Sequence, residues 1–168
     1  RERMLRMYQF VRTSIPGCER SVIKYMAGHG LARETYRTEG EYIISKEDFL
    51  GAVDFEDKIC NAFNYIDMHN TKTGCDVCFH EDRSMVPTVP FRALIPKGSS
   101  RITVAGRIVS ADRVSLAGIR AQCTCMAMGQ AMGAAAALGI QKGVPSREIA
   151  AKNIVALTVE HGAVPLKD

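Results

Sequence analysis

Hydrophobic side chains recur at a helical period near the start of the chain. Met4 and Leu5 are followed at helical spacing, among Arg and Glu side chains, by Tyr8 and Val11. This spacing is typical of an amphipathic helix. Pro16 and Gly17 end the pattern. The sequence therefore predicts a helix over residues 1–14, followed by a turn.

Two short runs after this turn favour strands. Residues 21–26 contain Val, Ile and Tyr, residues 41–45 contain Tyr and two Ile, and the polar stretch 32–40 separates the two runs. Such runs predict a hairpin or two strands of a sheet. Ser45 and the two acidic residues that follow it closely are typical of a helix N-terminus. We therefore expect a short helix from Ser45 to about residue 53.

The middle of the chain alternates between apolar and polar stretches. Residues 62–69 read as a strand, and the polar stretch 70–84, broken by Gly74, reads as a loop or a loose hairpin. A turn at residues 96–98 then leads into residues 101–105, which we expect to form another strand.

A long run of small and apolar residues follows at 123–140, where Ala, Gly and Met dominate. The run is long enough to span a membrane, but Ala and Gly gain little from transfer into lipid, and Gln130 lies in its middle. A buried helix of a soluble protein is therefore favoured, and no membrane span is expected. Gly129 and Gly133 lie four residues apart and leave one helix face almost without side chains. This face predicts the close approach of another part of the protein.

The last part of the chain predicts one more helix. Gly143 and Pro145 end the small-residue run, and residues 146–161 are amphipathic, with Gly162 as their stop. Three residues are expected to face inward: Ile149, Ile154 and Leu157. Together these elements predict a mixed α+β chain.

Composition narrows the class of protein. With 168 residues, 46% hydrophobic and 24% charged, the chain has the size and composition of one globular domain or a piece of one. Its net charge of +4 is spread along the sequence, so we expect no nucleic-acid partner. Six cysteines in a chain of this size do not require a disulfide framework. No secretory signal is visible near Arg1, and the compartment stays open, with the cytoplasm as the default.

Several spaced segments carry a resemblance to a known family. In chain order they are Arg33-Glu34-Thr35 with Arg37, Gly40-Glu41-Tyr42, Ile66-Asp67-Met68-His69, Phe91-Arg92, Leu94 to Gly98, Val104-Ala105-Gly106-Arg107, Ser110-Ala111, Ile119-Arg120 and Thr124 to Leu138. This set resembles the C-terminal part of the FAD-dependent oxidoreductase family, in the expected order and over most of the chain. The sequence departs from the usual pattern at Gly118, Cys123 and Asp112-Arg113, where Ser, Pro and Thr-His are common.

The resemblance implies FAD as the cofactor and hydride transfer from an organic small-molecule substrate. The Arg and His residues of the expected substrate cavity suggest a hydroxylated substrate, such as a sugar or its acid. It places the N-terminus of the small-residue helix at the flavin, where backbone N–H groups stabilise negative charge on the reduced ring. The cofactor-binding residues it implies are Ala105, Gly106, Arg107, Ser110, Met126, Gly129 and Gln130.

The resemblance also divides the chain into a partial substrate-facing region, residues 1–100, and the returning part of the FAD domain, residues 101–168. No G-x-G-x-x-G follows a strand here, so the N-terminal FAD-binding half is expected as a missing partner. Alone, this piece is expected to be inactive, to lose FAD and to self-associate through exposed surface.

Two sets of polar residues are candidates for substrate chemistry. Asp67 and His69 alternate on a predicted strand and should face the same side, which suits a general base and its orienting carboxylate. A structural or exposed histidine is the alternative. Four arginines are candidates for holding a carboxylate or hydroxylated ligand, or else for pairing with acids and solvent: Arg33, Arg37, Arg92 and Arg120.

Cys75-x-x-Cys78, with His80 nearby, suggests a metal or redox site. A structural zinc site needs four ligands, and the usual second pair is missing, so we expect no metal. Two other functions stay open: a non-catalytic interaction or structural module that keeps the flavoprotein fold, and a small cysteine-ligated metal domain.

Overall fold

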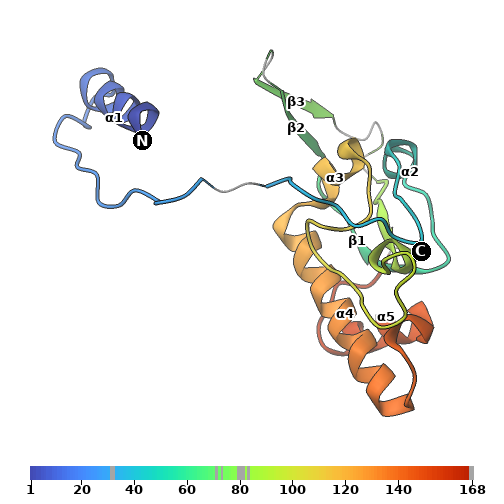
Figure 1. The fold of residues 1–168 in the computed structure, drawn as a ribbon. Coiled ribbons are helices and arrows are strands. Elements are labelled where there is room, and N and C mark those ends of the chain that lie inside the picture. Colours follow the sequence, from blue (N-terminus) through green and yellow to red (C-terminus); the bar gives the residue numbers. More distant parts are fainter. Residues whose placement is uncertain (31–32, 71, 73, 79–81, 83, 167–168) are drawn as a thin grey trace. The chain divides into compact units, whose positions relative to one another are not determined.

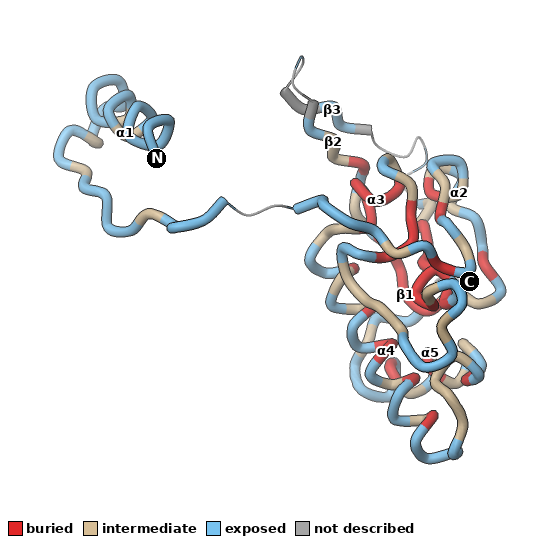
Figure 2. The backbone as a smooth tube through the Cα atoms, viewed as in Figure 1, coloured by how far each residue is buried: buried red, intermediate tan, exposed pale blue. Residues whose placement is uncertain are grey.

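The chain forms two compact units, residues 1–33 and 34–168, in a computed structural model (Figure 1). The structure describes residues 1–30, 33–70, 72, 74–78, 82 and 84–166. Buried residues are found in the second unit, whereas the described residues of the first are exposed or half-buried (Figure 2).

The first unit is built around helix α1, Glu2–Ser14, which confirms the helix predicted over residues 1–14. The chain then turns back, and the Tyr8 hydroxyl donates to the carbonyl of Ser21 at 3.0 Å. The strand predicted at residues 21–26 is wrong, because this stretch has no regular structure. A β-favouring run needs a neighbouring strand to satisfy its backbone N–H and C=O groups, and the described part of this unit supplies none.

The second unit contains two small antiparallel sheets. Strand β1, Lys58–Asn61, pairs with β4, Thr88–Pro90, and β2, Ile66–Asn70, pairs with β3, Gly74–Cys78. The loop or loose hairpin expected over 70–84 is right in part, because β3 lies within this stretch but its partner β2 begins before it, at Ile66. The strand predicted over 62–69 is right only from Ile66 onward, since β1 ends at Asn61.

Two further strand predictions are wrong. Residues 101–105, all of them described, form no strand, and Val104 N–H donates to the carbonyl of Leu94 at 2.9 Å. Residues 41–45 contribute only an isolated bridge, from Ile44 to Ala111. In both places the run lacks the continuous neighbour that a β ladder requires.

Four helices complete the second unit: α2, Lys46–Leu50; α3, Arg113–Ile119; α4, Gln122–Lys142; and α5, Ala151–Glu160. Two short 3-10 turns lie at Phe91–Leu94 and Ser146–Glu148. The combination of helices and small sheets is a mixed α+β fold, as the sequence predicts.

Local capping signals explain where these helices begin and end. The Ser45 hydroxyl accepts from Asp48 N–H and the Asp48 carboxylate accepts from Ser45 N–H, a capping box that starts α2 as expected. Gly143 ends α4 in the left-handed conformation at φ 68°, which glycine adopts without strain. The last predicted helix is split into the second 3-10 turn and α5, because the backbone of Ile149 and Ala150 is extended.

The core of the second unit lies between α4, α5, α3 and the β1–β4 sheet. One face of α4 enters this core through six buried residues: Thr124, Met128, Ala131, Met132, Ala135 and Gly139. By length and composition α4 could cross a membrane, but core helices of soluble proteins can have the same length and composition. In this structure a third of an apolar 18-residue stretch of α4 is buried. Gly129 and Gly133 are exposed, and no described atom comes within 4 Å of a Cβ added at either position.

Candidate functional site

The functional candidates gather where β2 and the end of α3 meet the start of α4. Arg120, directly after α3, donates through Nη2 to the carbonyl of Asp67 on β2 at 2.6 Å and pairs through Nη1 with Glu34. The Arg120 side chain is only 9% exposed. It therefore ties three segments together, and its guanidinium is already engaged with an acid and a carbonyl.

Asp67 and His69 lie on the same side of β2, as their alternation predicts. His69 Nε2 lies 3.6 Å from Asp67 Oδ2, and the two side chains are 48% and 29% exposed. Arg120 holds the Asp67 backbone, so it also fixes the position of this pair. The arrangement suits a proton acceptor whose ring is oriented by a carboxylate, and it is open to a ligand from solvent. The catalytic role of the pair stays a prediction.

The other candidate arginines lie elsewhere. Arg92 pairs with Asp57, with 3.4 Å between Nε and Oδ1, and its guanidinium lies 4.8 Å from the centre of the Tyr42 ring. Arg92 therefore pairs with an acid, which is the alternative to holding a substrate. Arg33 belongs to the first unit and Arg37 is an exposed residue of the second. A substrate role for these two arginines stays a prediction.

Gly106 forms a tight turn between the 3-10 turn at Phe91–Leu94 and α3. Gly106 has φ 84°, a conformation that favours glycine, and its carbonyl accepts from Val109 N–H at 3.1 Å. Burial raises the pKa of the Cys125 thiol, while the positive charge of Arg107 acts against this shift. The charge of Arg107 therefore acts on the first turn of α4.

The remaining residues assigned to the cofactor differ in their surroundings. Ala105 is half-buried beside the Gly106 turn. Ser110 is fully buried, and its hydroxyl accepts from Gly40 N–H at 3.0 Å, which joins two chain segments. Met126 and Gly129 are exposed on α4, and Gln130 Nε2 lies 3.5 Å from the carbonyl of Thr158 on α5.

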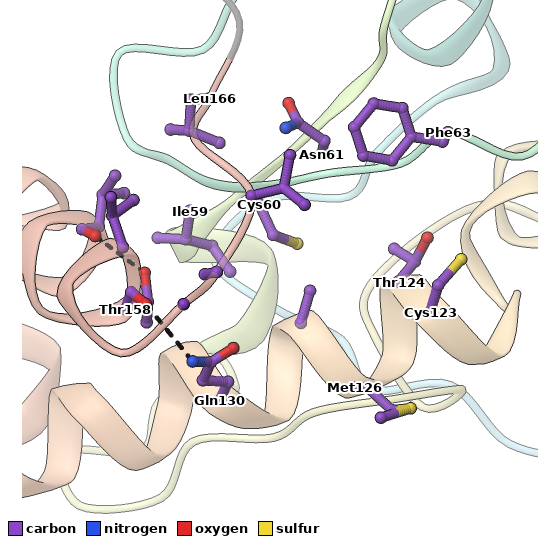
Figure 3. Close-up of a pocket in the computed structure, with 16 residues that line it drawn as sticks. Ile59, Cys60, Asn61, Phe63, Cys123, Thr124, Met126, Gln130, Thr158 and Leu166 are labelled. Atoms are coloured by element: carbon purple, nitrogen blue, oxygen red, sulfur yellow. Dashed lines mark hydrogen bonds between the residues drawn. The ribbon is translucent and has the colours of Figure 1, made fainter.

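A pocket of about 500 Å³ lies between β1, the first half of α4, α5 and the chain that follows α5 (Figure 3). Sixteen residues line it: Ile59, Cys60, Asn61, Phe63, Cys123, Thr124, Met126, Ala127, Gln130, Val155, Thr158, Val159, Gly162, Ala163, Val164 and Leu166. Met126 and Gln130 line the pocket and are also among the residues that the resemblance assigns to the cofactor. Gly106 and Arg107, which it also assigns to the cofactor, do not line the pocket.

Sequence reasoning missed two features of this region. Glu34, the partner of Arg120, stands in one of the segments that carry the family resemblance, and that context was the available signal. Thr124 also stands in such a segment, whereas Asn61 gave no signal. The place of both on the pocket wall depends on the packing of β1 against α4.

The described cysteines are free thiols in different surroundings: Cys18, Cys60, Cys123 and Cys125. The side chains of Cys75 and Cys78, and all of His80, lie outside the described residues. Within the part of the chain that the structure describes, no group of three or more His, Cys, Asp or Glu side chains could hold a metal ion.

These surroundings predict unequal thiol reactivity. Burial raises the pKa of the Cys60 thiol to about 12, and the nearby Cys125 adds to this shift, whereas Cys123 is exposed. Alkylation requires the thiolate. At pH 8 we expect iodoacetamide to modify Cys123 at least about 100-fold faster than Cys60. Mass spectrometry of peptides would measure the extent of modification at each cysteine over time. Cys60 should react once urea unfolds the chain, and equal rates in the folded protein would contradict this picture.

Comparison with known proteins gives one match. A family model described as FAD dependent oxidoreductase matches residues 1–157 of the 168. No curated protein and no solved structure matches the chain.

Proposed function

Because this chain belongs to the FAD-dependent oxidoreductase family, we propose that it supplies the substrate-facing region and the flavin-edge helix of an enzyme that oxidises an organic substrate. The observation that carries this proposal is the family match over residues 1–157, and the positive charge of Arg107 that acts on Cys125 in the first turn of α4 supports it. FAD, when bound, supplies the acceptor for the hydride.

The start of α4 has properties that fit a flavin. Its N-cap residue, Ala121, gives no side-chain hydrogen bond to the helix, so the first backbone N–H groups are not capped in this way. The positive end of the helix dipole and the nearby Arg107 favour negative charge at the same place. Residues Gln122 to Cys125 would face the edge of the ring that becomes negative on reduction, with Arg107 beside them.

The pair on β2 would handle the proton of the substrate. In this proposal His69 accepts the proton of a substrate hydroxyl, Asp67 orients the imidazole, and Arg120 positions both by holding the Asp67 carbonyl. Arg120 is then a positioning residue, because its guanidinium is already engaged with Glu34. A hydroxylated substrate, such as a sugar or its acid, is the class that this chemistry fits.

We further propose that the exposed glycine face of α4 packs against a partner that binds the adenosine part of FAD. Gly129 and Gly133 leave room for a close backbone approach, and no described residue fills it. This chain alone would then hold FAD poorly and could self-associate through the same face. A clean monomer at high concentration in size-exclusion chromatography would count against self-association.

The first test is the visible absorption spectrum of the complete enzyme beside that of this 168-residue chain. We expect flavin bands in the complete enzyme and none in the chain. Flavin in neither protein would overturn the proposal and favour the non-catalytic module.

A variant of the complete enzyme tests the proton acceptor. His69→Asn should keep its flavin and lower the rate of flavin reduction by hydroxylated substrates about 100-fold or more. His161→Asn is the matched control, since His161 is exposed just beyond α5 and should leave the rate unchanged. Equal rates in His69→Asn and the parent enzyme would remove His69 from the mechanism.

A further inference from the structure

The pocket beside α4 has the size and lining of a small-molecule site. Its volume of about 500 Å³ lies within the range of known ligand pockets. Most of its walls are apolar, formed by side chains such as Ile59, Met126, Val155 and Leu166, and none of the sixteen lining residues is charged. A charged guest would lose its hydration without gaining a counter-ion, so this lining selects a neutral one.

Two buried oxygens on this wall lack hydrogen-bond partners. Asn61 is 6% exposed and Thr124 is 1% exposed, and neither Asn61 Oδ1 nor Thr124 Oγ1 has a partner in the described structure. Both residues line the pocket (Figure 3). The Asn61 amide donates to the carbonyl of Pro165 at 2.9 Å, which leaves Oδ1 as an acceptor in need of a donor.

This lack of partners sets Asn61 and Thr124 apart from a similar residue on the same wall. The Thr158 hydroxyl donates to the carbonyl of Val155 at 2.9 Å and is therefore satisfied within α5. A buried polar group without a partner destabilises the folded chain. A guest that supplies the missing partners recovers this free energy, so Asn61 and Thr124 are the groups that would recognise it.

We propose that this pocket binds an uncharged, largely apolar molecule that ends in a carboxamide or a hydroxyl group. The N–H or O–H of the guest donates to Asn61 Oδ1, and an oxygen of the guest accepts from the Thr124 hydroxyl, after small rotations of the two side chains. The pocket shares Met126 and Gln130 with the residues that the resemblance assigns to FAD, and Cys123 and Thr124 with the proposed flavin edge. Its test on the 168-residue chain without FAD does not depend on the proposed function.

Titration of the 168-residue chain with 2-naphthamide tests this site directly. The chain contains no Trp, so naphthalene emission can be followed without a tryptophan background. Saturable binding is expected, and 2-ethylnaphthalene, which has the same rings without the polar group, should bind about tenfold more weakly.

Two matched variants separate recognition from general packing. Thr124→Val removes the hydroxyl that has no partner and should weaken 2-naphthamide binding about tenfold, while the thermal midpoint stays equal to or above that of the parent chain. Thr158→Val makes the same chemical change at a satisfied hydroxyl and should change the affinity less than about twofold. Ala127→Leu, which fills the pocket from α4, should abolish binding.

Several outcomes would overturn the site. These are the absence of saturable binding to a chain that circular dichroism shows to be folded, equal affinity for 2-naphthamide and 2-ethylnaphthalene, and equal loss of affinity in Thr124→Val and Thr158→Val. If Thr124→Val fails to fold, Ala127→Leu and the comparison of the two naphthalenes decide the question in its place.

Discussion

A Gly118→Ser variant is expected to lose about 3 kcal/mol of unfolding free energy, at the upper end of the usual cost of overpacking a core. A Cβ at position 118 would lie 2.2 Å from Cζ of Phe49, a separation that real Cβ atoms do not show. Phe49, on α2, is 1% exposed, so its ring can make room only by displacing its neighbours in the core. The measurement is urea denaturation followed by circular dichroism.

Two further variants test this explanation. Gly129→Ala, where an added Cβ meets nothing within 4 Å, should stabilise the chain by up to about 1 kcal/mol through helix propensity. Gly118→Ser combined with Phe49→Leu should lose less than the sum of the two single changes, because the smaller side chain makes room. If the losses of unfolding free energy are additive, or if Gly118→Ser is as stable as the parent, then the Phe49 ring is not what excludes a serine side chain at position 118.

This contact gives a physical reason for one departure from the family pattern. Serine is common at the position of Gly118, and in this chain the Phe49 ring occupies the space that a serine side chain would need. The departure is thus explained by packing between α2 and α3. A role at the flavin is not required to account for it.

Asp112→Ala should cost about 2 kcal/mol, because one carboxylate serves three backbone donors. Asp112 caps α3, where Oδ1 accepts from the N–H groups of Val114 and Ser115 at 2.8 Å each. Its Oδ2 accepts from Lys46 N–H at 2.7 Å, at the start of α2. Thermal and urea unfolding should both report the loss.

The neighbouring residue and a conservative variant are the controls for Asp112. Arg113→Ala changes an exposed side chain and should stay within about 0.5 kcal/mol of the parent. Asp112→Asn keeps one carbonyl oxygen at the cap and should lie between the parent and the alanine variant. A loss in Arg113→Ala as large as that in Asp112→Ala would show that capping is not the cause.

The sequence by itself determined α1, α2 and α4, because their signals are local. The apolar period of α1, the capping box of α2 and the glycine after α4 lie within one or two turns of the residues they organise. The alternation that places Asp67 and His69 on one side of β2 is local in the same way. The segments that identify the family also stand in the sequence itself.

Only the tertiary structure decided the strands and the contacts between elements. Residues 101–105 have β-favouring side chains but no continuous neighbour, whereas the three residues of β4 form a strand because β1 lies beside them. The pairing of Arg120 with Glu34 joins residues 86 positions apart. Both depend on which distant segments meet in the folded chain, and single-sequence periodicity carries no information about that.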